Sequence, residues 1–513
     1  MKRKKIKNCI VGMITLLSMT FTTAYAAQDN TIIVDSQLGK VQGVLNEGVM
    51  AFYGVPYAQN PFVEGRRFQA PQAIQAWDGV LDCTTLTPPV PQPSRGRSIT
   101  LVGAAGDLTV NIWAPISALK TSEKLPVMVW IPGGAFIRED ASQSVYQGES
   151  FAKQGVIVVT INYRVGVDGF MHLAGAPDNR GILDQILALQ WVHHNIVDFG
   201  GDAQQVTLFG QSAGAESVAI LLGTDKTKGL FQKVIMQSPP MQVLTRKEAE
   251  QLADAFAKQL AVSASLEGIA SVSYPKLVAA VVELGHTITD REQWGKLSWG
   301  GTAFLPVVDN NIIHKTAVLD LANADPSIPV IVGSTDQEAR LYLVPGGQLQ
   351  RIKAEKVSLF LKDLALSGKP TDVYRQTDQG QSAGDIYADL SSDYTFRMPA
   401  LHIAEKLVSN GNPVWHYNFS WQSPTFGAAH FIDVPFTFNT TQTAEAKRLI
   451  GSHAPQSLAN AMHRQWTDFA KTGKADWPQY QLNKRATMRF DTQSHVVDDA
   501  EKKVRLLWTD YVF

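Results

Sequence analysis

The chain has almost no cysteine. Only Cys9 and Cys83 occur among its 513 residues, and Cys9 falls within a segment expected to be removed. The mature protein would then hold a single cysteine and close no internal disulfide, although we expect it to be exported. A large hydrophobic core must supply its stability instead, and hydrophobic residues make up 45% of the chain.

The sequence also lacks a hydrophobic run long enough to cross a membrane. Its N-terminus has five basic residues among the first seven, then a short apolar stretch over 9–21, then the small-x-small triplet Ala24-Tyr25-Ala26. This arrangement is typical of a cleaved signal peptide, and the apolar stretch is too short to span a bilayer. We therefore expect residues 1–26 to be removed, with export to the periplasm or out of the cell and no stable membrane anchor. Residues 27–513 are expected to form one domain.

Neither sign of charge dominates. The chain has 46 Lys and Arg against 47 Asp and Glu, and loss of the leader's five basic residues takes the formal net charge from −1 to −6. This balance argues against nucleic acid or an anionic membrane surface as a partner. No proline-rich linker, charge block or internal repeat divides the chain, which favours a single large domain.

Continuous apolar, β-branched runs recur along the chain and predict parallel strands that are buried on both faces. They occupy 127–131, 156–161, 206–209, 234–236, 330–332 and 414–419. Helical patterns lie between several of these runs, at 182–197, 213–222 and 247–260. The alternation predicts an α/β fold with a large, mostly parallel, doubly wound sheet flanked by helices. Ligands should bind beyond the carboxyl ends of the strands.

One of these strand ends carries a specific motif. The run 206–209 leads into Gly210-Gln211-Ser212-Ala213-Gly214, and a helix of small residues follows. The pentapeptide alone is common by chance, but this context predicts a nucleophile elbow that exposes the Ser212 hydroxyl on a strained turn. Glycine at 210 and 214 would avoid crowding the neighbouring elements. The Ala213 N–H would face the same space, as an oxyanion donor.

Three other strand ends carry candidate groups. The run 127–131 leads into small residues, among which Gly134 and Ala135 are further candidate oxyanion donors, unless the segment is a plain turn. Glu338 follows 330–332 and suits the role of orienting an imidazole. Asp336 is the alternative there, and we expect it only to cap a turn. His430 follows 414–419, in a loop of small residues, and is the candidate general base.

We expect the remaining histidines to lie at ordinary structural positions and to form no metal site. His193 and His194 are adjacent in a predicted helix and lack the i, i+4 spacing of metal ligands. His416 is a further unremarkable alternative to His430. We expect no cofactor and no metal.

The chain order Ser212, Glu338, His430 is that of α/β-hydrolases. A serine hydroxyl is a weak nucleophile that needs a base to take its proton. The pattern predicts a serine esterase that cleaves small-molecule carboxylic esters through an acyl-enzyme. A hydrolase of amides, carbamates or lactones would use the same three residues. A non-catalytic binding module is the other alternative, and the intact trio argues against it.

Motifs along nearly the whole mature chain resemble the type-B carboxylesterase family, which includes carboxylesterases, cholinesterases and para-nitrobenzyl esterases. The similar segments are Phe52–Ala58, Arg67–Pro71, Leu108–Trp113, Asn162–Gly166, Asp184–Leu189, Gly229–Phe231 and Gln237–Ser238. The resemblance implies an α/β-hydrolase fold. It also implies a triad of Ser212, Glu338 and His430, and an oxyanion hole of Gly134, Ala135 and Ala213.

The chain departs from the family pattern at several positions. Pro132 stands where the family usually has His or Tyr, and Gln211 stands where it often has Glu. The family's first disulfide is missing, and the loop from Pro91 to Gly106 has no Trp to stack on choline, which disfavours a choline ester. Gln211, together with Ser238 and Asp433, is expected to lie around the triad.

Overall fold

The apolar runs form one large sheet in the computed structural model, which describes residues 30–95, 99–377 and 382–513. The signal peptide expected at 1–26 lies outside these residues. The central strands pair in parallel in the order β9-β8-β10-β11-β12-β13-β14. They are β8 (Leu125–Ile131), β9 (Ile157–Ile161), β10 (Gly201–Gln211), β11 (Lys233–Gln237), β12 (Val330–Thr335), β13 (Val414–Phe419) and β14 (Ala486–Phe490). All six predicted strands are confirmed.

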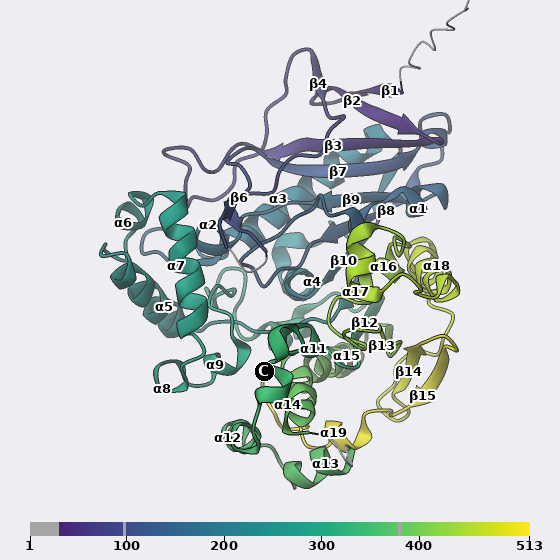
Figure 1. The fold of residues 1–513 in the computed structure, drawn as a ribbon. Helices are drawn as coiled ribbons and strands as arrows, with labels where there is room; N and C mark the ends of the chain where they lie inside the picture. Colours follow the sequence, from purple (N-terminus) through teal and green to yellow (C-terminus); the bar gives the residue numbers. More distant parts are fainter. Residues whose placement is uncertain (1–29, 96–98, 378–381) are drawn as a thin grey trace, which may run out of the picture. The chain divides into compact units, whose positions relative to one another are not determined.

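Antiparallel strands extend both edges of this sheet (Figure 1). At one edge lie β1 (Thr31–Ser36), β2 (Gly39–Asn46), β3 (Val49–Ala58) and β7 (Leu108–Pro115), with β4 (Val80–Asp82) beside β2; at the other lies β15 (His495–Asp498). The short strands β5 (Gln92–Pro93) and β6 (Leu101–Val102) pair separately. In β2, the buried Val41 and Gly43 alternate with the more exposed Lys40 and Gln42, which fits a strand with one solvated face.

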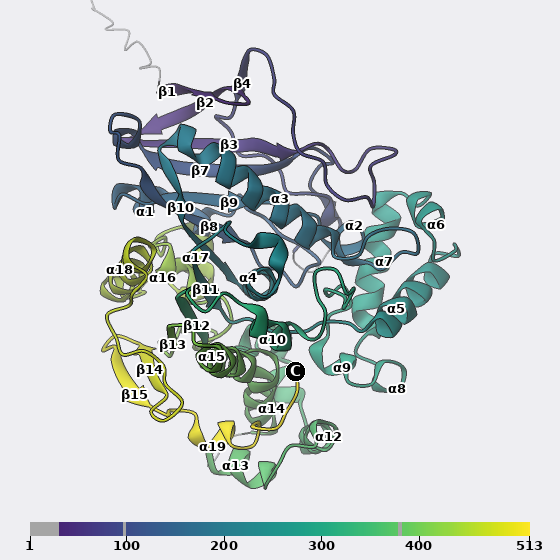
Figure 2. The ribbon, with the colours of Figure 1, turned by 180° about the vertical axis from the view of Figure 1, so that it is seen from behind.

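Two hydrophobic cores lie on opposite faces of the sheet. Successive residues of β8 alternate between them: Val127 and Val129 join one core, and Met128 and Trp130 join the other. Helices α3 (Arg180–Asn195), α4 (Ala213–Gly223) and α15 (Met398–Asn410) cover the first face, which Figure 2 shows from the front. Helices α1 (Glu149–Lys153), α16 (Val434–Thr437) and α18 (Gln456–Thr472) pack on the second. The predicted doubly wound α/β fold is confirmed.

The longest connections follow β11 and β12 and carry many short helices. After β11 come α5 (Arg246–Gln259), α6 (Leu266–Ala270), α7 (Tyr274–Thr287), α8 (Arg291–Trp294), α9 (Leu297–Gly300) and α10 (Ala317–Asp320). After β12 come α11 (Arg340–Leu343), α12 (Ala354–Leu364), α13 (Pro370–Thr377), α14 (Ala383–Ser392) and the π-turn η8 (Asp393–Arg397). The other helices are α2 (Gly166–Phe170), α17 (Ala444–Ile450) and α19 (Lys502–Arg505). Within the described ranges, none is long and apolar enough to cross a membrane.

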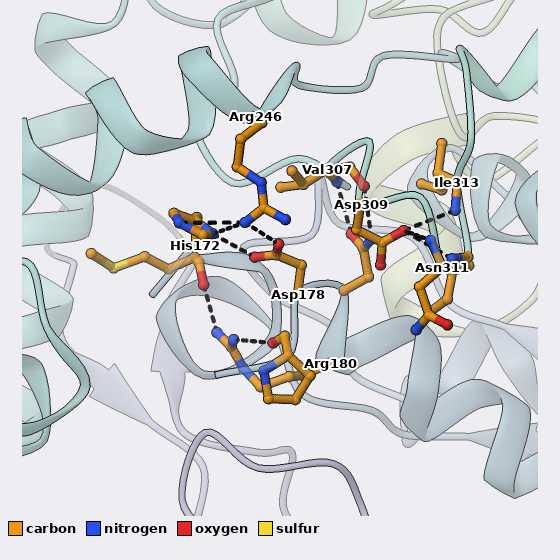
Figure 3. A network of polar contacts seen from close by, with 12 residues as sticks. His172, Asp178, Arg180, Arg246, Val307, Asp309, Asn311 and Ile313 are labelled. Carbon is orange, nitrogen blue, oxygen red and sulfur yellow. Dashed lines mark hydrogen bonds and ion pairs between the residues drawn. The ribbon is translucent and has the colours of Figure 1, made fainter. Parts of the chain in front are cut away.

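A polar network fastens the insertion after β11 to the start of α3. Figure 3 shows His172 and Arg246 converging on the Asp178 carboxylate, with His172 Nδ1 and Arg246 Nη1 each 2.8 Å from its oxygens. In the same view, Arg180 donates to backbone carbonyls, and the Asp309 carboxylate accepts N–H groups of the turn that follows it. These contacts hold α5 against the sheet domain, and the segments that follow α5 reach the site described next.

Candidate active site

Ser212 occupies a sharp turn between β10 and α4. The strand ends at Gln211 and the helix begins at Ala213, which leaves Ser212 at φ 57° and ψ −129°, a strained conformation for a residue with a side chain. A Cβ on Gly210 would lie 2.6 Å from the Gly214 carbonyl carbon, and one on Gly214 would lie 2.0 Å from the Ile131 oxygen. The predicted strand–serine–helix arrangement is therefore present, and both glycines are required for the close approach.

Glu338 is fully buried and its carboxylate is fully engaged. One oxygen accepts the Ser238 hydroxyl at 2.6 Å and the Thr335 N–H at 2.7 Å. The other lies 2.5 Å from His430 Nδ1. Because an ionised carboxylate only accepts hydrogen bonds, Nδ1 carries the proton, and Nε2 of a neutral ring is left as the acceptor.

His430 is held in place from several sides. Only 3% of the residue is exposed, and its backbone N–H donates to the Glu338 carbonyl at 3.1 Å. Phe396, from the π-turn η8, stacks on the ring with centroids 4.2 Å apart, and Tyr342 of α11 contacts it at 5.8 Å. Turns of π-helix are rare and occur often at functional sites. Phe396 and Tyr342 belong to no sequence motif, so the sequence did not point to them.

The alternatives to Glu338 and His430 take other positions. The Asp336 carboxylate pairs with Arg489 at 2.7 Å, so the expectation that it only caps a turn is wrong. His416 lies inside β13, bonds to Thr487 at 3.1 Å, and has its pKa lowered to about 3 by burial. His193 and His194 lie in α3, as predicted.

The segment after β8 places two backbone N–H groups next to the elbow. Gly134 has φ 135° and Ala135 has φ 57°, so the chain turns sharply here. Within the described residues, neither N–H donates to a protein acceptor. The Ala213 N–H is the first of α4 and has no acceptor within its helix. These three N–H groups are the candidate oxyanion donors of the sequence analysis, and that role stays a prediction.

Pro132 does not disrupt this segment. Its carbonyl accepts the Tyr163 hydroxyl at 2.7 Å, and Tyr163 is fully buried. Gly133 follows it and approaches the elbow closely, because a Cβ there would lie 2.5 Å from the Gln211 carbonyl oxygen. Pro132 has no N–H to donate, but the hydrogen bond from Tyr163 fixes its carbonyl in place.

Asp433 lies behind the histidine and is fully buried. One of its oxygens accepts the Gln237 amide and the Tyr417 hydroxyl, both at 2.9 Å. Burial raises the pKa of Asp433 to about 6, with a contribution from the Glu338 charge, while these two donors oppose the shift. The three residues expected around the triad, Gln211, Ser238 and Asp433, all lie there.

A cavity of about 760 Å³ opens over Ser212 and Ala213. Aromatic and aliphatic side chains form much of its wall: Phe136 follows β8, and the long connections after β11 and β12 contribute Trp299, Tyr342, Leu359, Tyr387 and Phe396. The sequence did not reveal these walls, because where short helices and loops pack over the site depends on long-range contacts.

A strained serine at the carboxyl end of a parallel strand, with a buried imidazole–carboxylate pair nearby, defines an α/β-hydrolase. The model of the carboxylesterase family matches residues 30–507, and the chain belongs to that family. The chain is 35% identical over 495 residues to the para-nitrobenzyl esterase of Bacillus subtilis (strain 168), a match that covers 92% of this chain and 97% of the relative.

Solved structures agree with the sequence comparison. The Geobacillus stearothermophilus carboxylesterase at pH 6.2 superposes with a TM-score of 0.82 at 30% identity, over 93% of this chain and 99% of that one. A para-nitrobenzyl (PNB) esterase superposes with a TM-score of 0.77 at 34% identity, over 92% and 99% of the two chains. The predicted family and fold are confirmed, and the chain is a carboxylic ester hydrolase.

Proposed function

We propose that the chain hydrolyses esters through an acyl-enzyme on Ser212, with His430 as the general base and Glu338 as the acid that orients it. The contact between His430 Nδ1 and Glu338 at 2.5 Å carries this proposal. It directs the proton to Nδ1 and leaves the lone pair of Nε2 to act as the base.

In the first half-reaction, the Ser212 oxygen attacks the ester carbonyl carbon while Nε2 of His430 accepts the hydroxyl proton. The N–H groups of Gly134, Ala135 and Ala213 stabilise the negative oxygen of the tetrahedral intermediate. Collapse breaks the bond to the alcohol oxygen, which takes the proton from Nε2. Water then attacks the acyl-serine and gives a proton to Nε2. Collapse of this second intermediate breaks its bond to the Ser212 oxygen, which takes that proton back from Nε2 as the acid is released.

The apolar wall of the cavity supports a small-molecule ester with an apolar acyl or alcohol group as the substrate. We also propose that the protein acts outside the cytoplasm, after removal of residues 1–26. The basic, apolar and small-x-small segments of the N-terminus support this localisation.

A Ser212→Ala variant tests the nucleophile. Hydrolysis of p-nitrophenyl esters from acetate to decanoate is compared between wild type and variant. We expect the variant to lose about a thousandfold or more in kcat/KM, because the nucleophile is gone. The chain-length profile of the wild type measures how long an acyl group the cavity accepts.

Ser217→Ala is the matched control. Ser217 is a buried serine of the same helix, and its hydroxyl accepts the Gln185 amide at 3.1 Å, away from His430. We expect it to keep wild-type activity within a small factor. Activity that survives in Ser212→Ala would contradict the proposed role of Ser212.

A further inference from the structure

The side-chain amide of Gln211 packs against the imidazole of His430. Its nitrogen lies 2.9 Å from Nε2 and 3.4 Å from Nδ1. Because the in-plane lone pair of Nε2 points away from Nδ1, a nitrogen this close to both ring nitrogens lies over the face of the ring. Gln211 is the residue before the nucleophile, and only 1% of it is exposed.

Glu338 selects the tautomer of the ring, because its carboxylate is an acceptor at Nδ1 and the proton of a neutral ring lies there. The Gln211 amide instead limits how far the ring can tilt, because its nitrogen is close to both ring nitrogens. The in-plane lone pair of Nε2 stays available for the Ser212 proton.

The Gln211 side chain is also in contact with the oxyanion segment. A Cβ on Gly133 would lie 3.2 Å from the Gln211 side-chain oxygen and 3.0 Å from the Ser212 Cβ. The amide is thus confined between the glycine segment and the imidazole. Its oxygen faces one and its nitrogen faces the other.

We propose that Gln211 is a positioning residue that holds the plane of the His430 ring, so that the lone pair of Nε2 is directed at Ser212 when an ester binds. The inference rests on the proposed function. The amide packs on the ring together with the stacked Phe396, so both restrict its tilt. Leucine would lose the polar contact of the amide with the ring, and a carboxylate would place a negative charge there.

Gln211→Leu tests the positioning role, because it keeps the approximate size and removes the amide. We expect kcat for p-nitrophenyl acetate to fall about tenfold, because the ring is held less firmly for proton transfer, with KM nearly unchanged. We also expect the far-downfield proton resonance of the Nδ1–H between His430 and Glu338 to shift or broaden. This resonance needs no substrate, so it tests Gln211 even if the ester assay fails.

Gln211→Glu adds a second readout, the pH profile of kcat/KM. Besides the new carboxylate, Glu338, Asp433 and Tyr342 are the titratable groups that face the ring. A further negative charge favours the protonated ring, so we expect the acidic limb of the profile to move to higher pH by about one unit.

Gln185→Leu is the control for the loss of a buried amide. Gln185 contacts α4 through Ser217 and does not touch His430. We expect similar thermal unfolding in Gln185→Leu and Gln211→Leu but a changed resonance only in the latter. An unchanged resonance in Gln211→Leu, or an unchanged or increased kcat, would overturn the proposal.

Discussion

At the scale of single residues, two buried carboxyl groups of this protein differ in how well their oxygens are hydrogen-bonded. Glu338 accepts hydrogen bonds at both oxygens, whereas Glu216, four residues after Ser212 in α4, has mainly the Gln242 N–H facing it. Burial raises the pKa of Glu216 well above its ordinary value of 4.5. The helix that follows the elbow therefore carries a carboxyl whose protonated form is favoured by burial.

This difference predicts a pH effect on stability at Glu216. Because the pKa of Glu216 is raised in the folded state, the stabilisation of the fold by its protonated carboxyl is fully present below pH 4.5. This stabilisation is lost as the pH rises. While the group stays protonated in the folded protein, the free energy of unfolding falls by about 1.4 kcal/mol per pH unit. We expect Glu216→Gln to abolish this decline, so the variant gains on wild type between pH 5 and pH 8 in denaturant unfolding.

Glu250→Gln makes the same change on the exposed face of α5. We expect its stability to follow wild type at every pH. If Glu216→Gln also ran parallel to wild type from pH 5 to pH 8, Glu216 would not be a protonated group in the folded protein.

At the scale of secondary-structure elements, the approach of α4 to β8 shapes the elbow. Gly214 leaves so little room that a methyl group would lie 2.0 Å from the Ile131 carbonyl oxygen. We expect Gly214→Ala to lower the free energy of unfolding by about 2 kcal/mol or more. Esterase activity should fall further than stability explains, because Ser212 and the Ala213 N–H move with the helix.

Gly285→Ala provides the comparison. Gly285 lies in the last turn of α7 and is exposed, and a methyl group added there would meet no atom within 4 Å. Alanine is the better helix former, and we expect a gain of up to about 1 kcal/mol with unchanged activity. Equal stability and activity in the two variants would show that the close approach at Gly214 does not shape the site. Thermal unfolding and ester hydrolysis measure both effects.

At the scale of the whole molecule, the order of strands in the sheet assembles the site. Ser212, Ser238, Glu338 and His430 follow β10, β11, β12 and β13, which are consecutive neighbours in the sheet. Parallel pairing brings their carboxyl ends to one edge, where crevices form. Residues more than 200 positions apart, Gln211 and His430, meet there as a consequence.

A further prediction for the whole chain concerns its export and the removal of residues 1–26. We expect the protein recovered outside the cytoplasm to begin at Ala27, with a mass that lacks residues 1–26. Replacing Ala24 and Ala26 by bulky residues should block cleavage, because the peptidase requires small side chains there. Intact mass measurement of the fractionated protein checks both. A full-length wild-type chain found only in the cytoplasm would contradict the prediction.

The sequence by itself determined the parallel strands, the elbow, and the candidates Ser212, Glu338 and His430. Local patterns encode all of these, since burial on both faces gives continuous apolar runs and a tight turn demands glycine. The sequence also named Gln211, Ser238 and Asp433 as neighbours of the triad, but it did not say which atoms they would contact.

Only the tertiary structure decided those contacts and the surroundings of the site. The packing of the Gln211 amide on the ring, the stacking of Phe396 on His430 and the walls of the cavity depend on how the sheet and the long connections after β11 and β12 fold together. A helical pattern in such a connection predicts the helix but not where it packs, because the path of the segment is set by long-range contacts. The error on Asp336 has the same origin, because its partner Arg489 lies 153 residues away in β14.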